Sequence, residues 1–227
     1  MASLALVGAD GSGKTTIGQL LAEDPPVPLK YIYMGLNIES SNVALPWSRL
    51  FLRIKLARYR READQRGITD PTFVSTHHVE HRSIDRGPVT STLRLFNRLA
   101  ETAYRQLVSW VHQRRGFLVL YDRHFLFDAA TATRHRQRTD RIYSWTVNHA
   151  FPKPTRVLFL DAPAEVLFAR KGEGTVDYLE RKRQACIAQG ALVPHFIRID
   201  AELPLPEVLD TVRRHAVALV SGNDVLS

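Results

Sequence analysis

The chain has 227 residues, of which 44% are hydrophobic and 24% charged, a composition typical of a globular protein that buries its own core. Its single cysteine, Cys186, excludes an internal disulfide framework, and a reducing cytoplasm is the expected location. The 31 Lys and Arg residues exceed the 23 Asp and Glu residues, and the formal net charge of +8 favours anionic ligands such as nucleotides. Since no run of about 18 uncharged apolar residues occurs, we expect no membrane-spanning segment.

Short apolar runs alternate along the chain with longer stretches of helical periodicity. The predicted strands cover residues 3–7, 30–33, 117–121, 156–160 and 196–199. The predicted helices cover residues 14–22, 47–65, 90–114, 141–149, 163–170, 176–189 and 206–220. This alternation predicts an α/β fold in which helices cover a parallel sheet, formed by one domain over residues 1–227.

Two segments, 35–46 and 67–88, lack clear periodicity. Long irregular segments in compact domains are commonly lids or binding loops, and we interpret 67–88 as an acceptor-side loop. This loop contains His77, His78 and His81, and on a helix His77 and His81 would share a face and could bind zinc. Histidines in a long polar loop more often face solvent or contact anions.

The predicted helix over 47–65 and the arginine that follows it are strongly basic. The basic residues are Arg49, Arg53, Lys55, Arg58, Arg60, Arg61 and Arg66. A surface for nucleic acid or anionic lipid is one interpretation. We favour a solvated basic face opposite an apolar side formed by Trp47, Leu50, Phe51 and Ile54.

The strongest functional signal is the run Gly8-Ala9-Asp10-Gly11-Ser12-Gly13-Lys14-Thr15, which matches GxxxxGK[ST] between a predicted strand and a predicted helix. Glycines let the backbone curl so that its N–H groups face phosphate oxygens, and the next helix adds the positive end of its dipole. Lys14 would reach the β- and γ-phosphates, and the Thr15 hydroxyl would ligate Mg²⁺. We therefore expect ATP and Mg²⁺ to bind, with nucleotide contacts from Gly8, Asp10, Gly11, Ser12, Gly13, Lys14, Thr15 and Thr16.

A second site is predicted at Asp122, at the carboxyl end of an apolar strand, where open α/β sheets bind their ligands. Asp122 would hold Mg²⁺ directly or through water, and Arg123 would grip a second phosphate group bidentately. The alternative is that the pair only caps the next helix. Asp161 also ends an apolar run, but no cation follows it, so we prefer Asp122.

A basic run with two glycines, Arg170-Lys171-Gly172-Glu173-Gly174, lies between two predicted helices. Such a hinge can swing cations over a bound nucleotide, exclude water and neutralise charge in the transition state. We expect residues 170–176 to form a lid, with an ordinary turn between helices as the alternative.

These motifs resemble those of the thymidylate kinases, within the P-loop nucleoside monophosphate kinases. The resemblance rests on VGADGSGKTT at the start of the chain, RRGFLVLYDRH at 114–124 and LDAPAEVLFARKGEGTVDYLERKR at 160–183. It implies a three-layer α/β/α sandwich of the P-loop type with a five-stranded parallel sheet and a lid, and commonly a homodimer. The catalytic residues that it implies are Lys14, Asp122, Arg123, Arg170 and Lys171, with Thr15 and Asp122 at the metal.

The acceptor side departs from the family pattern. Phe127 and Ala130-Thr131-Ala132 stand where the family usually has a serine and then Ala-Tyr-Gln. Glu101 stands where the family has a base-reading arginine, with Arg98 one turn earlier. The family's Arg-Glu-Pro-Gly segment is replaced by Tyr33-Met34-Gly35-Leu36-Asn37. The resemblance therefore supports a kinase but leaves its acceptor open.

The predicted function is transfer of the γ-phosphoryl group of Mg-ATP to a small acceptor, with a nucleoside monophosphate as the first choice. A phosphate monoester is already ionised and needs no general base, whereas a hydroxyl acceptor would favour Asp10 or Asp122 as proton acceptor. One alternative is a P-loop kinase for a non-nucleotide molecule such as a sugar or metabolite. The other is an ATP-dependent module that binds a partner through its basic helix. We expect a small-molecule acceptor rather than a nucleic acid or a membrane.

Overall fold

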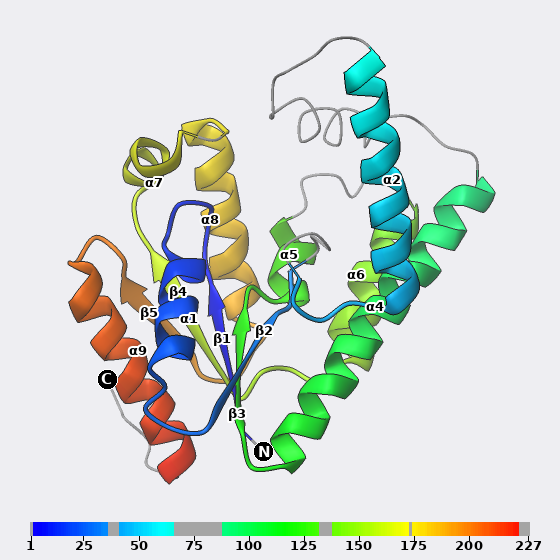
Figure 1. Cartoon of the computed structure of the whole chain (residues 1–227). Coiled ribbons are helices and arrows are strands. Elements are labelled where there is room, and N and C mark those ends of the chain that lie inside the picture. The colour runs from blue at the N-terminus through cyan, green and yellow to red at the C-terminus, as the bar shows by residue number, and fades with distance from the viewer. Residues whose placement is uncertain (1, 36–40, 66–87, 132–137, 173, 223–227) are drawn as a thin grey trace.

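The computed structural model describes residues 2–35, 41–65, 88–131, 138–172 and 174–222. Its strands are β1 (Ser3–Val7), β2 (Leu29–Tyr33), β3 (Leu118–Asp122), β4 (Arg156–Asp161) and β5 (Phe196–Asp200). They form one sheet in the order β2-β3-β1-β4-β5, with every neighbouring pair parallel. The helices are α1 (Lys14–Glu23), α2 (Pro46–Gln65), α4 (Pro88–Arg114), α5 (Phe125–Thr131), α6 (Arg138–Ala150), α7 (Ala164–Lys171), α8 (Val176–Gly190) and α9 (Leu205–Ser221) (Figure 1).

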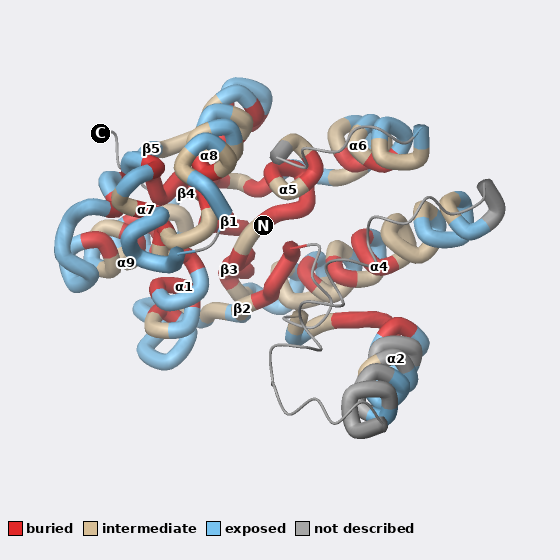
Figure 2. Tube along the Cα trace, turned by 90° about the horizontal axis from the view of Figure 1, so that it is seen from above, coloured by how far each residue is buried: buried red, intermediate tan, exposed pale blue. Residues whose placement is uncertain are grey.

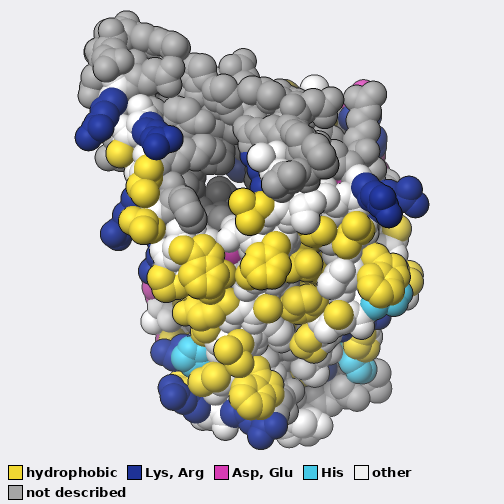
Figure 3. Space-filling model, turned by 90° about the vertical axis from the view of Figure 1, so that its right-hand side faces the viewer, with side chains coloured by type: hydrophobic (Ala, Val, Ile, Leu, Met, Phe, Trp, Pro, Cys, Tyr) yellow, Lys and Arg dark blue, Asp and Glu magenta, His cyan; other side chains and the backbone are white. Residues whose placement is uncertain are grey.

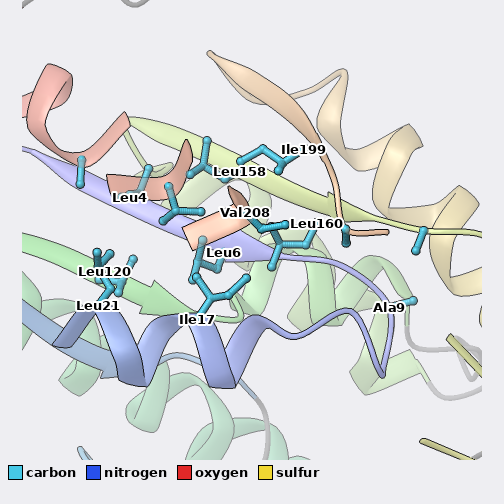
Figure 4. Packing of buried hydrophobic residues seen from close by; sticks show 14 of the residues in the cluster. Leu4, Leu6, Ala9, Ile17, Leu21, Leu120, Leu158, Leu160, Ile199 and Val208 are labelled. Carbon is cyan, nitrogen blue, oxygen red and sulfur yellow. The ribbon is translucent and has the colours of Figure 1, made fainter. Parts of the chain in front are cut away.

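The three central strands are buried along their whole length, so their sequences read as continuous apolar runs rather than as an alternating pattern. Alternate side chains nevertheless meet different helices. One face packs against α1 and α9, where the cluster includes Leu4, Leu6, Leu120, Leu158, Leu160, Ile17, Leu21 and Val208 (Figure 4). Each leucine buried in this way contributes about 2 kcal/mol to folding.

The opposite face of the sheet packs against α4, α5, α6 and α8. Its strand residues are Ala5, Val7, Val119, Tyr121, Val157 and Phe159. Figure 2, which looks along the sheet from above, shows the buried strands between the two groups of helices. The result is a three-layer α/β/α sandwich around a five-stranded parallel sheet, and the predicted fold class is confirmed.

All five predicted strands are present, and none of their ends differs from the predicted position by more than one residue. The seven-residue helix α5 was not predicted, because it spans only two turns and shows too little periodicity. The division of the chain into one domain with a loop over 67–88 stays a prediction, and residues 67–87, including His77, His78 and His81, lie outside the described residues.

The apolar side of α2 is exposed at three of its residues. Trp47, Leu50 and Ile54 are 48%, 57% and 43% exposed. The first turn of α2 is the part that is anchored: Ser48 is buried, and the Trp47 Nε1–H donates to Asn97 Oδ1 of α4 at 3.1 Å. The helix follows the edge strand β2 in the chain and points away from the sheet (Figure 1).

Parallel strands place all their carboxyl ends at one edge, which is the upper edge of the sheet in Figure 1. The loop after β1, the Asp-Arg pair at the end of β3 and the end of β4 therefore meet there, although they are far apart in the sequence. Among the helices that the structure describes, none is both long enough and apolar enough to cross a membrane.

Candidate active site

The loop between β1 and α1 has a tight backbone that only glycine can form at two positions. Gly11 has a φ of +88°, and a Cβ at this residue would lie 2.7 Å from the Leu167 carbonyl oxygen of α7. A Cβ at Gly8 would lie 2.5 Å from the Leu160 carbonyl oxygen of β4. The loop is thus pressed against its neighbours, and its curled form is set by residues that have no side chain.

Lys14 lies inside this curl and is 4% exposed. Its Nζ donates to the Ala9 carbonyl oxygen at 2.6 Å and to Ser12 Oγ at 3.0 Å. Burial, followed by the nearby Arg123 guanidinium, lowers the pKa of Lys14 to about 8. A buried cation with only neutral oxygens as direct partners is poorly compensated, and an anion bound against the loop would compensate it.

Asp10 of the same loop joins two cations that come from distant elements. Its Oδ1 accepts from Arg123 Nη2 at 2.9 Å, and its Oδ2 accepts from Lys182 Nζ of α8 at 2.7 Å. Burial alone would raise the pKa of Asp10, but Lys182 and then Arg123 hold it well below its usual range. Asp10 is therefore a charged anchor that holds both cations beside the loop, and it is a weak base.

Arg123 follows β3 with a φ of +63°, a backbone conformation that residues other than glycine rarely adopt. Its N–H donates to the Leu6 carbonyl oxygen of β1 at 3.1 Å, which holds the residue in place. Strain of this kind costs on the order of 1 kcal/mol and gathers at functional sites. The conformation directs the guanidinium to Asp10.

Asp122 is fully buried at the end of β3. Its Oδ2 accepts from the Tyr31 hydroxyl at 2.7 Å, and burial followed by this bond raises the pKa of Tyr31. Its Oδ1 is buried with no hydrogen-bond partner among the described residues. A carboxylate oxygen left open in this way fits the predicted role of Asp122 at a metal.

Asp161, the rival carboxylate, is already neutralised. Arg183 of α8 binds it with two nitrogens, at 2.6 and 3.0 Å, and Arg198 of β5 forms a further ion pair with it. Both of its oxygens thus have cationic partners, which favours Asp122 as the residue available to a ligand. Within the described part of the chain, no group of three or more His, Cys, Asp or Glu side chains could hold a metal.

The predicted site residues are only partly brought together. Asp10, Lys14, Asp122 and Arg123 lie close enough to influence one another electrostatically. Thr15 and Thr16 lie exposed at the start of α1. The Arg170 guanidinium donates to the Ala201 carbonyl oxygen beyond β5 at 2.8 Å, and Lys171 is exposed at the end of α7. The structure thus directs Arg170 to the turn after β5 rather than to the Asp10 cluster.

Lys182 is the cation that the sequence interpretation missed. It lies on α8, just beyond the predicted lid, and takes the position beside Asp10. Its neighbour Arg183 binds Asp161 instead. The sequence signal was weak, because four basic or acidic residues follow one another at 180–183 and their directions depend on how α8 packs.

A small pocket adjoins Arg123 on the side of α4, α5 and α6. Its walls include Met34, Gly35, Glu101, Arg105, Phe125 and Tyr143. A Cβ at Gly35 would lie 2.8 Å from Cδ of Arg123, so the pocket and the charged cluster are neighbours. Arg105 Nη1 donates to the Gly35 carbonyl oxygen at 2.6 Å and holds the chain after β2 against α4.

No protein-family model matches the chain, and no curated protein matches it either. Among solved structures, it is similar to the deoxyadenosine kinase from M. mycoides, determined with the products dCMP and a flexible dCDP bound. The TM-score is 0.50, and the likeness covers 95% of this chain and 99% of that chain at 13% sequence identity. At this identity the likeness concerns the fold, which this chain shares with that kinase.

Proposed function

We propose that the protein is a phosphotransferase that moves the γ-phosphoryl group of Mg-ATP to the phosphate of a nucleoside monophosphate. The observation that carries this proposal is the convergence of Lys14, Arg123 and Lys182 around Asp10, beside a curled loop that requires glycine. Three cations against the carboxylates of Asp10 and Asp122 leave a site that favours bound phosphate.

The donor would bind at residues 8–15. The N–H groups of the loop and the first turn of α1 would face the β- and γ-phosphates, and Lys14 Nζ would exchange its contacts with Ala9 and Ser12 for phosphate oxygens. The Thr15 hydroxyl and Asp122 Oδ1 would hold magnesium. When bound, magnesium would neutralise charge that develops on the phosphate oxygens.

The acceptor would bind on the Arg123 side of the loop. A phosphate monoester arrives with its oxygen ionised, so the protein needs to orient it and neutralise its charge rather than remove a proton. Arg123 and Lys182 supply that charge, with Asp10 keeping both in position. Because both oxygens of Asp10 are paired and its pKa is strongly lowered, it is a poor general base for a hydroxyl acceptor.

The lid over 170–176 is part of the same proposal. Gly172 and Gly174 have φ values of +66° and +79°, so the joint between α7 and α8 has the backbone freedom that a hinge uses. Closure would bring Arg170 and Lys171 over the nucleotide, and it requires Arg170 to release the Ala201 carbonyl oxygen.

A nucleoside hydroxyl is the second candidate acceptor. The fold neighbour favours it, since that protein is a deoxyadenosine kinase. Thymidylate itself is one candidate among the monophosphates, because the acceptor pocket does not reproduce the family's pattern.

A homodimer also belongs to the proposal. Large apolar side chains gather on the outer surface of α4 and α6, where Leu93, Phe96, Leu107, Trp110, Ile142 and Trp145 are exposed (Figure 3). Light scattering at micromolar concentration measures the oligomeric state, and a monomer would remove this part of the proposal.

The test is an ATP-coupled screen of acceptors that includes deoxynucleoside monophosphates, deoxynucleosides and sugar phosphates. We expect ADP release with one or more monophosphates and little with nucleosides. Turnover of nucleosides alone would replace the monophosphate acceptor with a hydroxyl acceptor. Turnover of sugar phosphates alone would favour a non-nucleotide acceptor, and no turnover with any acceptor would favour the ATP-dependent binding module.

A further inference from the structure

We infer that Glu101 reads the base of the acceptor and that this base carries an amino group, as cytosine and adenine do. The inference rests on the proposed function, because it names the class of nucleotide that the same site accepts. It is carried by one carboxylate oxygen and by the walls of the pocket beside Arg123.

Glu101 is 5% exposed, and its two oxygens have different surroundings. Oε1 accepts from the Leu45 N–H at 3.1 Å. Oε2 is buried and has no hydrogen-bond partner among the described residues. Arg105 Nε forms an ion pair with Oε2 at 3.6 Å, which is beyond hydrogen-bond distance.

Arg105 does not supply the missing donor, because it is engaged elsewhere. Its Nε donates to the Val43 carbonyl oxygen at 3.0 Å and its Nη1 to the Gly35 carbonyl oxygen at 2.6 Å. Buried carboxylate oxygens are rarely left without a donor, since a missing hydrogen bond to a charged group is costly. Glu101 lines a pocket, so a ligand there that brings an N–H group would complete the coordination of Oε2.

The other walls of the pocket suit a flat ring. Met34, Phe125 and Tyr143 supply buried apolar and aromatic surface. A Cβ at Gly35 would lie 2.6 Å from the end of the Tyr33 side chain and 2.8 Å from Arg123 Cδ, so the pocket and the Arg123 side chain are direct neighbours. A nucleotide whose phosphate contacts Arg123 would therefore extend its base toward Glu101.

The pocket holds about 40 Å³ of free volume, so a base needs some side chains to move. Arg98 is the side chain best placed to do so. Its guanidinium lies 4.0 Å from the centre of the Tyr143 ring, its side chain is 33% exposed, and it pairs with Asp140 at 2.7 Å. A flat cation on an aromatic ring occupies space that a stacked base could take.

The donor pattern of the pocket selects among bases. A carboxylate oxygen can only accept a hydrogen bond. The 4-amino group of cytosine and the 6-amino group of adenine donate, whereas uracil and hypoxanthine place a carbonyl oxygen at the same position. The Thr102 hydroxyl donates to the Arg98 carbonyl oxygen at 2.9 Å, and the Tyr143 hydroxyl lies 3.0 Å from Thr102 Oγ1 and donates to it, so neither hydroxyl has a hydrogen left for a carbonyl oxygen of the base.

The test compares bases that differ only at this position, dCMP with dUMP and dAMP with dIMP. For the wild-type protein we expect kcat/KM to be at least about tenfold higher for the amino member of a pair. In Glu101→Gln, the amide oxygen can still accept from the Leu45 N–H while the amide nitrogen donates to a carbonyl. The amino-over-oxo ratio should therefore fall at least about tenfold or reverse.

Glu23→Gln is the matched control, because it makes the same chemical change at an exposed site at the end of α1 and should leave the ratio unchanged. A wild-type preference for dUMP and dIMP, or a ratio that Glu101→Gln does not move, overturns the inference while the proposed function stands. If only nucleosides are phosphorylated, the proposed function fails, and the ratio measured with deoxycytidine and deoxyuridine decides the role of Glu101. The wild-type ratio decides the matter even if Glu101→Gln does not fold.

Discussion

The two ends of the candidate site are built in different ways. At the phosphate end, residues 8–15 form one contiguous loop whose shape depends on its own glycines, and Arg123 and Lys182 reach that loop from the end of β3 and from α8. The pocket beside Arg123 is assembled from distant segments: the Arg105–Gly35 hydrogen bond joins residues 70 positions apart, and the Arg98–Asp140 bond joins residues 42 apart. A contiguous motif can change little without losing its chemistry, whereas an assembled pocket can change one wall at a time.

The two ends also differ in the groups that they offer to a ligand. Lys14, Arg123 and Lys182 offer cations at the phosphate end. The pocket is lined by Arg98, Arg105 and Glu101, and Glu101 Oε2, although ion-paired with Arg105, has no hydrogen-bond donor in the described part of the chain. A ligand that binds at both ends would thus place a phosphate at the phosphate end and an N–H group in the pocket. Variants at the phosphate end should reduce turnover of every acceptor, and variants in the pocket should change which acceptor is preferred.

The largest effect is expected for Lys14→Met. Removing the buried cation takes away the charge that faces the donor phosphates, so kcat should fall about 10³-fold or more for every acceptor. Steady-state ADP release measures it. Lys153→Met, at an exposed lysine that donates to the Leu192 carbonyl oxygen, is the control and should stay near wild type. Retention of a tenth or more of the activity in Lys14→Met would contradict the assigned role.

Gly11→Ala should lower the free energy of unfolding by about 3 kcal/mol. The alanine would be strained at a φ of +88°, and its Cβ would clash with the Leu167 carbonyl oxygen at 2.7 Å. Gly222→Ala has a similar positive φ of +71° but no atom within 4 Å of the added Cβ, so it should cost only about 1 kcal/mol. Urea denaturation of both variants separates the two contributions. Equal losses would mean that the contact between the loop and α7 contributes nothing.

Lys182→Gln should lower kcat/KM about 30-fold for phosphate-bearing acceptors, because Asp10 loses a partner and the site loses a cation. The adjacent Arg181 is exposed on the same helix, so Arg181→Gln is the matched control. The two variants are compared with the same acceptor series. Equal activity in both would place Lys182 outside the reaction.

The effect of pH on kcat/KM for ATP should be smaller than the effects of these substitutions. We expect a fall of about tenfold at one pH unit above the pKa of Lys14. Burial lowers the pKa of ligand-free Lys14 from 10.5 to about 8, so kcat/KM for ATP should fall as pH rises above about 8. The free energy of unfolding of the ligand-free protein should rise as the pH rises from 8 to 10.5. In this window Lys14 keeps its proton in the unfolded chain but loses it in the folded protein. A flat kcat/KM profile up to pH 10 would argue against this assignment.

The difference between the ends also explains what could be predicted from the sequence. The strands were predicted closely because central strands covered on both faces are continuous apolar runs. The tight glycine-rich loop could be located because its pattern is local, and its binding of phosphate stays a prediction. The position of Lys182 beside Asp10 and the missing hydrogen-bond donor at Glu101 Oε2 could not be predicted from the sequence. The first depends on how α8 packs against the sheet, and the second on how α4 does. The exposed apolar side of α2 is a further example, because amphipathic periodicity identifies an apolar helix face but not the element that covers it.

The most direct measurement follows backbone amide signals of ¹⁵N-labelled protein during titration with a non-hydrolysable ATP analogue and Mg²⁺, and then with a nucleoside monophosphate. We predict that the analogue moves the amides of residues 8–16 most, and that the monophosphate moves those of Arg123 and of α4 around Glu101. Unchanged amides at residues 8–16 with millimolar analogue, or equal shifts at both ends with either ligand, would contradict the division of the site into a phosphate loop and a separate acceptor pocket.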